Sequence, residues 1–229
     1  MHIEKICPRI YFAKFENQYS MCMTMLRIVE YSSNPMFHKK PFTLESYMDW
    51  YSEKIGNGHF DFDKTYYGFA VMSADIRRFI KNFPNSMLCK KEKQFLEMLT
   101  EIVGKDKIFG PKSFYVITSF NKEKGIVFKH ELAHIIYHIN PDYKKDVDSL
   151  VKRLSKRIRK EMSDYLVDED LYTKEEVIDE INARLSTGNH VSTEFKNQVR
   201  CSDRVMSNYK DLFNRYSSKY LNGECENAK

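Results

Sequence analysis

The apolar residues that follow position 120 recur at the spacing of α-helices, and this pattern limits the possible folds more than any other feature of the chain. One sector of a helix collects Val127, Phe128, Leu132, Ile135, Ile136 and Ile139. Because Pro141 cannot simply continue that helix, it is predicted to cover residues 125–139. Further helices are predicted over residues 141–162, 174–186 and 194–221. The second half of the chain is therefore expected to be almost wholly helical.

Residues 1–120 show a mixed pattern that is rich in aromatic side chains. Runs typical of short strands lie at residues 9–15, 21–31, 69–72 and 113–120. Helices are predicted over residues 44–55, 73–83 and 90–103. The whole pattern predicts an α+β fold, with a mixed lobe over residues 1–120 that contains a small sheet and a helical lobe over residues 121–229. The two lobes are expected to form one compact unit, because no linker separates them.

The composition predicts a folded chain that does not span a membrane. Of its 229 residues 42% are hydrophobic, which is enough for a buried core. No apolar run approaches the roughly 18 to 20 residues of a membrane span. Charged and apolar residues alternate at the start of the chain, so no signal peptide is predicted and a cytoplasmic location is expected. The five cysteines are scattered without a C-x-x-C pair, which favours reduced thiols over disulfides or a cysteine zinc cluster.

Residues 130–134 read His-Glu-Leu-Ala-His, an H-E-x-x-H sequence within the helix predicted over residues 125–139. Side chains four residues apart lie on the same face of a helix, so the imidazoles of His130 and His134 can bind one Zn²⁺ ion. Glu131 is placed to take a proton from a water molecule at the metal rather than to bind the metal. The alternative is a buried, hydrogen-bonded pair of histidines without a metal. The helical context of the motif favours the zinc site.

A catalytic zinc site usually takes three protein ligands, so a third ligand must come from another part of the chain. The helix predicted over residues 174–186 offers the carboxylates of Glu175, Glu176, Asp179 and Glu180. Its apolar face is formed by Val177, Ile178, Ile181 and Leu185. Glu180 flanks this face, whereas Glu176 and Asp179 are predicted to point toward water. We therefore favour Glu180 as the third ligand, with Glu176 as the alternative.

These residues resemble the gluzincin-type zinc metallopeptidases, in which an H-E-x-x-H helix is followed by a glutamate ligand on a later helix. The resemblance implies a zincin-like fold and a zinc ion bound by His130, His134 and Glu180. It also implies that Glu131 is the general base. The strand at residues 113–120 would then be the sheet edge on which a peptide substrate lies extended.

The chain departs from the patterns of such peptidases at two places. Tyr137 and Asn140 stand where the metzincin extension has a glycine and a third histidine. Gluzincins commonly carry an acid four residues after the ligand glutamate. Arg184 occupies this position for Glu180, whereas Glu180 itself occupies it for Glu176. The sequence therefore leaves the third ligand open between these two glutamates.

Other polar residues near the motif have several interpretations. His138 lies one turn further along the motif face, and it either supports a ligand, faces the substrate or has a structural role. A structural role is favoured, because one ion bound by His130 and His134 does not normally reach it. Candidate donors of a hydrogen bond to an oxyanion are Tyr137, Tyr143, Tyr165 and Tyr172.

Two further patterns have simple structural interpretations. Residues 144–160 contain eight Lys or Arg residues, which could contact phosphates. The apolar stripe of the same segment favours a packed amphipathic helix, so nucleic-acid binding is not favoured. In residues 58–63, alternation predicts a strand with Phe60 and Phe62 on its buried side. His59, Asp61 and Asp63 would lie on its polar side, where they form an outer face or, alternatively, hold a second ion.

The motif and its context predict a zinc-dependent hydrolase, specifically a metallopeptidase that acts on a peptide or protein substrate with Zn²⁺ as its cofactor. The alternative is a non-catalytic zincin-like module that binds or regulates another macromolecule. The sequence contains no P-loop and no G-x-S-x-G, so it gives no support to nucleotide hydrolysis or serine esterase chemistry.

Overall fold

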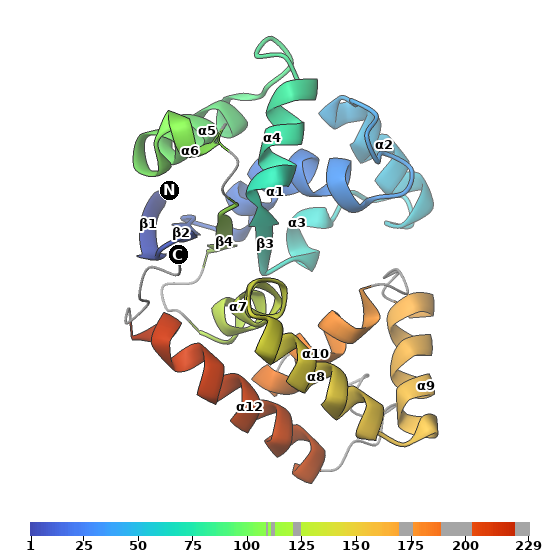
Figure 1. The fold of residues 1–229 in the computed structure, drawn as a ribbon. Coiled ribbons are helices and arrows are strands. Elements are labelled where there is room, and N and C mark those ends of the chain that lie inside the picture. The colour runs from blue at the N-terminus through green and yellow to red at the C-terminus, as the bar shows by residue number, and fades with distance from the viewer. Residues whose placement is uncertain (109, 111–112, 121–124, 170–175, 189–202, 223–229) are drawn as a thin grey trace. The chain divides into compact units, whose positions relative to one another are not determined.

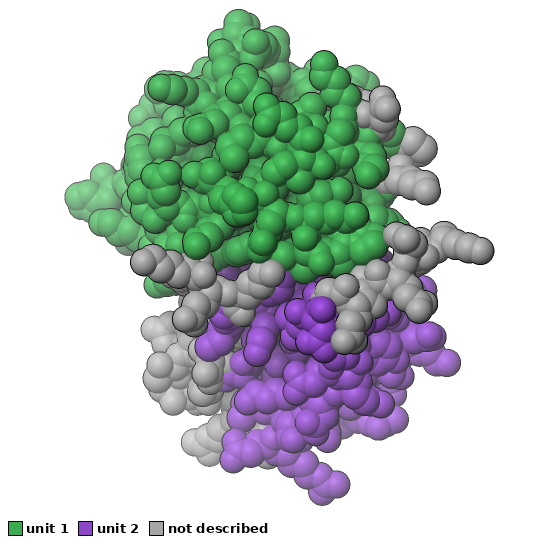
Figure 2. Space-filling view, turned by 90° about the vertical axis from the view of Figure 1, so that its left-hand side faces the viewer, with its two compact units in different colours: residues 1–123, 226–229 green, residues 124–225 purple. Residues whose placement is uncertain are grey.

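The computed structural model describes residues 1–108, 110, 113–120, 125–169, 176–188 and 203–222. The chain forms two compact units, Met1–Glu123 and Lys124–Cys225 (Figure 2). The first unit combines a small sheet with helices, and the described part of the second unit is helical. The predicted α+β class is therefore confirmed.

The first unit contains a four-stranded sheet with the strand order β1-β2-β4-β3 (Figure 1). Its strands are β1 (His2–Cys7), β2 (Ile10–Lys14), β3 (Gly68–Met72) and β4 (Tyr115–Ser119). β4 is parallel to β2 and antiparallel to β3, and it lies between them. The expectation that residues 113–120 form a sheet edge is therefore wrong. All five residues of β4 are buried, as is typical of an interior strand, and the edge strands are β1 and β3.

The first unit also contains helices, and some of them contact the sheet. The helices are α1 (Gln18–Ser33), α2 (Leu44–Lys54), α3 (Phe62–Thr65), α4 (Ser73–Asn82), α5 (Lys90–Val103) and α6 (Lys105–Ile108). The helices predicted over residues 44–55, 73–83 and 90–103 are confirmed as α2, α4 and α5. Thr43 begins α2 by accepting a hydrogen bond from the Ser46 backbone N–H at 3.1 Å.

Residues 21–31 form the middle of α1, so the prediction of a strand there is wrong. Almost all of these residues are buried. A helix that is apolar on all sides loses the 3.6-residue period by which a helix is recognised in a sequence. The helix begins after Asn17, whose side-chain oxygen accepts a hydrogen bond from the Ser20 backbone N–H at 2.8 Å.

A buried ion pair joins α1 to α5. Arg27 Nε donates to Glu92 Oε1 at 2.8 Å, and its Nη2 atom also contacts the same carboxylate. The guanidinium further donates to the Met87 carbonyl at 2.8 Å, while Glu92 accepts from the Cys89 backbone N–H at 2.8 Å. Both charged side chains are almost fully buried, so each depends on the other for its charge balance.

Residues 58–63 do not form the predicted strand, because Phe62 begins the short helix α3. The aromatic pair does pack as expected, with the rings of Phe60 and Phe62 stacked at a centroid distance of 6.3 Å. Asp61 accepts a hydrogen bond from the Tyr51 hydroxyl at 2.9 Å and thereby ties this segment to α2. Within the described ranges, residues 58–63 contribute to no grouping of the kind that holds a metal ion.

The second unit is a bundle of helices. They are α7 (Ile126–Ile139), α8 (Pro141–Arg153), α9 (Lys156–Asp164), the π-helical turn η1 (Tyr165–Glu169), α10 (Val177–Thr187) and α12 (Asp203–Leu221). α10 packs against α7, α8 and α12, and α12 also packs against α7 and α8 (Figure 1). The packed side chains include Phe128, Leu132, Ile136, Tyr143, Val147, Ile181, Leu185, Leu212 and Phe213. This packing brings the motif helix α7 against the acidic helix α10.

The helix predicted over residues 141–162 is divided into α8 and α9. Leu154 has an extended backbone with φ −61° and ψ 145°, which ends α8. Ser155 then begins α9, because its hydroxyl accepts a hydrogen bond from the Ile158 backbone N–H at 3.2 Å. Tyr143, Val147 and Leu154 are buried, as the amphipathic interpretation of this basic segment predicts. The helices predicted over residues 174–186 and 194–221 are described from residues 177 and 203 onward.

No helix in the described ranges is long and apolar enough to cross a membrane. Three of the five cysteines, Cys7, Cys22 and Cys89, are described, and none of these three is in a disulfide. The reduced state of the cysteines stays a prediction.

Candidate metal centre

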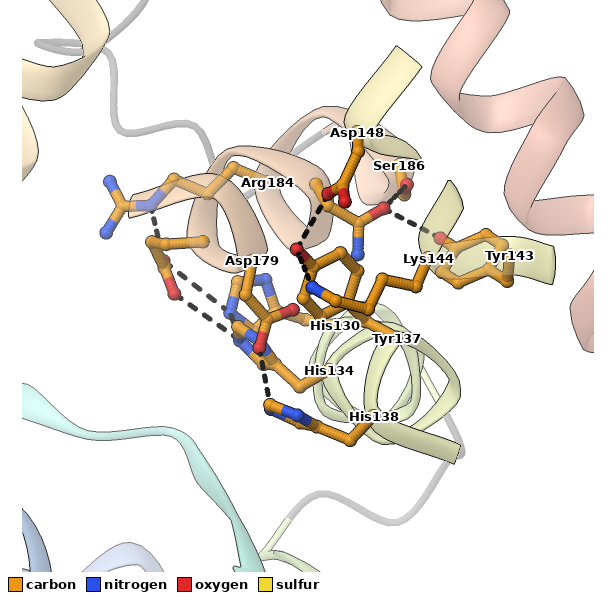
Figure 3. Close-up of polar contacts among 12 residues, drawn as sticks. His130, His134, Tyr137, His138, Tyr143, Lys144, Asp148, Asp179, Arg184 and Ser186 are labelled. Atoms are coloured by element: carbon orange, nitrogen blue, oxygen red, sulfur yellow. Dashed lines mark hydrogen bonds and ion pairs between the residues drawn. The ribbon is translucent and has the colours of Figure 1, made fainter. Parts of the chain in front are cut away.

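The helix α7 places the two motif histidines on the side that faces α10 (Figure 3). Its apolar residues, among them Leu132 and Ile136, are buried in the bundle. His130 and His134 lie one turn apart, and their Nε2 atoms are 3.2 Å from each other. Neighbouring ligand atoms of a tetrahedral zinc ion are separated by roughly 3.3 Å, as follows from metal–nitrogen distances of about 2.0 to 2.1 Å. The two imidazoles are therefore spaced as two ligands of one ion.

Glu180 on α10 completes this grouping. Its Oε2 atom is 3.4 Å from His134 Nε2, and its Oε1 atom is 3.8 Å from His130 Nε2. One ligand atom from each of these three residues lies within 4.8 Å of the others. The side chain of Glu180 is only 3% exposed, whereas Glu176 precedes α10 and is exposed. Of the two glutamates that the sequence left open, the structure brings Glu180 to the histidines and leaves Glu176 outside the group.

The residues of this grouping suit a zinc ion. Two imidazole nitrogens and one carboxylate oxygen are a common ligand set of catalytic zinc, and such a set leaves a position for water or substrate. Ala183, which is fully buried on α10, is small enough to allow a close approach between packed helices. The ligands thus come from two packed helices and face a common point.

Arg184 balances the charge of Glu180. Its Nε atom donates to Glu180 Oε1 at 2.6 Å, so Arg184 occupies the position where gluzincins commonly have an acid and binds the ligand carboxylate instead. Burial alone would raise the pKa of the Glu180 carboxyl, but His134, His130 and Arg184 together hold that pKa well below its ordinary value. Glu180 is therefore ionised, which is the form that binds metals.

Asp179 is a functional candidate that the sequence interpretation misplaced. Its Oδ2 atom lies 3.1 Å from His134 Nδ1 and 3.1 Å from His138 Nε2 (Figure 3). The prediction that Asp179 points toward water is wrong, and Ile178, which was assigned to the apolar face, is exposed instead. A hydrogen bond from His134 Nδ1 to a carboxylate leaves Nε2 for a metal and fixes the orientation of the ring. Two sequence features could have indicated this role of Asp179. His134 and His138 are four residues apart on one helix face, and the adjacent carboxylates Asp179 and Glu180 stand on the later helix.

The charged side chains around His134 shift one another's pKa values. Burial lowers the pKa of the His134 imidazole, but Asp179 and Glu180 outweigh burial and raise that pKa well above its ordinary value. Burial would raise the pKa of Asp179, yet His134 and His138 hold it below its ordinary value. A positive charge between two carboxylates is therefore favoured in this part of the bundle, and a divalent cation satisfies the same requirement.

Two of the four tyrosines proposed as oxyanion donors, Tyr137 and Tyr143, bind other side chains. The buried Tyr143 hydroxyl donates to Asn182 Oδ1 at 2.7 Å, and the Tyr137 hydroxyl donates to Asp148 Oδ1 at 2.8 Å. Tyr165 is buried in η1, and Tyr172 lies outside the described residues, as does Glu175. Tyr143 and Tyr137 thus hold α7, α8 and α10 together. Glu131 is half-buried and adjacent to His130 on α7, as the motif requires.

Comparisons with protein-family models, with curated proteins and with solved structures found no match to this chain. The zincin-like fold therefore stays a prediction. Function is inferred from the residues of the site and from their geometry.

Proposed function

We propose that this chain is a zinc-dependent hydrolase of the gluzincin type, with a zincin-like fold, that cleaves peptide bonds. One observation carries the proposal: His130, His134 and Glu180, from two helices, bring three ligand atoms within 4.8 Å of one another. The H-E-x-x-H sequence also supplies Glu131, which directly follows His130 and which a purely structural histidine pair does not need.

Each residue of the site has a distinct role in this proposal. His130, His134 and Glu180 would hold the ion, and Asp179 would orient the His134 ring from its Nδ1 side. A zinc ion held there would supply Lewis-acid chemistry, which polarises a carbonyl and lowers the pKa of water toward about 7. Glu131 would accept the proton of the attacking water on its carboxylate and pass it to the leaving amine. The substrate class is a peptide or protein.

Metal analysis combined with a peptide-library assay tests the proposal. We expect about one zinc per chain in the wild type, loss of zinc in His134→Ala, and full zinc content in Glu131→Gln. We expect Glu131→Gln to lose hydrolysis by about 10²- to 10⁴-fold, because the general base is removed while the ligands stay. His59→Ala is the matched control, since His59 is exposed and lies in the first unit.

Three results would contradict the proposal. A wild type without zinc would remove the metal site, and an unchanged rate in Glu131→Gln would remove Glu131 from its role. Zinc binding without hydrolysis would instead indicate the non-catalytic module that the sequence left as the alternative.

A further inference from the structure

A buried polar network surrounds Asn182, which lies three residues after Asp179 on α10. Asn182 is fully buried on α10, and its Oδ1 atom accepts from the Tyr143 hydroxyl at 2.7 Å and contacts the Ser186 hydroxyl at 3.2 Å. Both contacts are made by the oxygen of the amide. The Nδ2 atom of Asn182 is buried and has no hydrogen-bond partner.

Asp179 presents the complementary group. Its Oδ2 atom is shared by His134 and His138, while its Oδ1 atom is buried and has no hydrogen-bond partner. Asp179 and Asn182 are three residues apart on α10, so their side chains are neighbours on one side of the helix. An unpaired donor and an unpaired acceptor therefore lie on the same side of α10 in the protein interior, where leaving either of them unpaired destabilises the fold.

We propose that Asn182 is a positioning residue for the metal site, with its amide nitrogen bound to Asp179 Oδ1 through one buried water molecule. A water molecule in such a polar position accepts from the amide and donates to the carboxylate, which satisfies both groups. The Tyr143 hydroxyl fixes the direction of the amide, because it donates to the oxygen and leaves the nitrogen on the other side. The chain of contacts then runs from Tyr143 through Asn182 and Asp179 to His134.

This inference rests on the proposed function, because it gives Asn182 a role only through a metal ligand. A positioning role for Asn182 can be distinguished from a role in packing alone. A packing residue would stabilise the bundle whether or not Asp179 can accept hydrogen bonds, whereas a positioning residue acts through that carboxylate. The two roles are separated by a double-mutant cycle between Asn182 and Asp179.

The cycle is measured as zinc affinity, by competition with a chromophoric chelator. We expect Asn182→Leu to weaken zinc binding by about 10- to 100-fold, in the range found when groups that orient metal ligands are removed. Asp179→Asn should weaken it by a similar factor, and the double variant should bind zinc no more weakly than Asp179→Asn alone. Ser217→Ala is the matched control, because Ser217 is another buried polar residue of this unit whose hydroxyl has no partner. Its zinc affinity should stay within about twofold of the wild type.

Tyr143→Phe provides a second variant in case Asn182→Leu does not fold. It keeps the buried ring and removes only the hydroxyl that orients the amide, so zinc binding should weaken in the same direction and by a smaller factor. Circular dichroism checks the fold of each variant. Unchanged zinc affinity in a folded Asn182→Leu protein would overturn the inference, as would a loss that persists at full size in the Asp179→Asn background.

A measurement on the metal-free protein separates this inference from the proposed function. The Nδ1 proton of His134, which faces Asp179, gives an NMR signal that should shift or broaden in Asn182→Leu, while the ring signals of His38 stay fixed. If the wild type binds no zinc, the hydrolase proposal fails, and this signal still tests whether Asn182 acts through Asp179 on the His134 ring. An unchanged His134 signal would then overturn the inference.

Discussion

Three buried glutamates of this chain have three different kinds of partner. Glu92 is paired with Arg27, and Glu180 lies between Arg184 and the motif histidines. Among the described residues the hydrogen-bond partners of Glu30 are neutral, since Asn34 Nδ2 donates to its Oε2 atom at 2.7 Å and the Tyr47 hydroxyl also contacts it. A buried carboxylate without a cation is costly to ionise, so Glu30 differs from the other two in its response to pH.

Glu30 should make the stability of the first unit depend on pH. Burial raises the pKa of the Glu30 carboxyl, and the hydrogen bonds from Asn34 and Tyr47 only reduce that rise. Because the folded state holds this proton more tightly than the unfolded state, its contribution to stability is present at low pH. It is lost as pH rises through the folded pKa. We therefore expect the free energy of unfolding of Glu30→Gln, relative to wild type, to increase between pH 4 and pH 8. Urea unfolding at both pH values tests this, and a difference that stays constant would contradict it.

Among single residues, those of the candidate metal centre could be predicted only in part from the sequence. Helical spacing places His130 and His134 on one face of a helix. The place of Glu180 beside an apolar face favoured it as the third ligand but left Glu176 as the alternative. The position of Asp179 could not be predicted from hydrophobic periodicity, which places a charged side chain toward water. Asp179 points inward because its carboxylate accepts hydrogen bonds from two imidazoles there. Ile178 is then exposed to solvent, and the local sequence pattern gives no sign of this exposure.

At the scale of elements, the predictions failed where a helix lacks an exposed face or where a break lacks glycine and proline. α1 is buried on nearly all sides, so its apolar run resembles a strand. The break between α8 and α9 depends on the backbone of Leu154 and on the Ser155 cap, and a serine alone does not distinguish a cap from an exposed helix position. The sheet order depends on pairings between distant strands that no local pattern specifies.

The ion pair between α1 and α5 should be essential to the first unit. Arg27→Met would leave Glu92 charged and buried without its partner, which costs about 3 to 5 kcal/mol of unfolding free energy. The double variant Arg27→Met with Glu92→Gln should recover most of this loss, because the neutral amide oxygen can still accept from the Cys89 N–H. Denaturant unfolding of the single and double variants tests the prediction. A double variant as unstable as Arg27→Met would show that packing of the arginine, and not the unpaired charge, determines the loss.

At the scale of the whole molecule, the proposed metal ligands connect α7 and α10, which are separated in sequence but belong to the same unit. An ion that binds the folded unit and not the unfolded chain stabilises the fold by about 2.7 kcal/mol at a free concentration 100 times its dissociation constant. This stabilisation applies to the unit that supplies all three ligands. Metal binding at the proposed site would therefore be linked to the packing of α10 against α7.

Hydrogen exchange should reveal this link directly. We expect added Zn²⁺ to slow exchange most strongly in α7 and α10, because opening either helix away from the other would release the ion. The ligand variant His130→Ala should remove this protection, whereas Glu131→Gln should retain it, since Glu131 does not hold the metal. Mass spectrometry of peptides that cover the two helices provides the measurement. Equal protection in His130→Ala and wild type would mean that zinc acts at another place, and the assignment of His130 as a ligand would have to be abandoned.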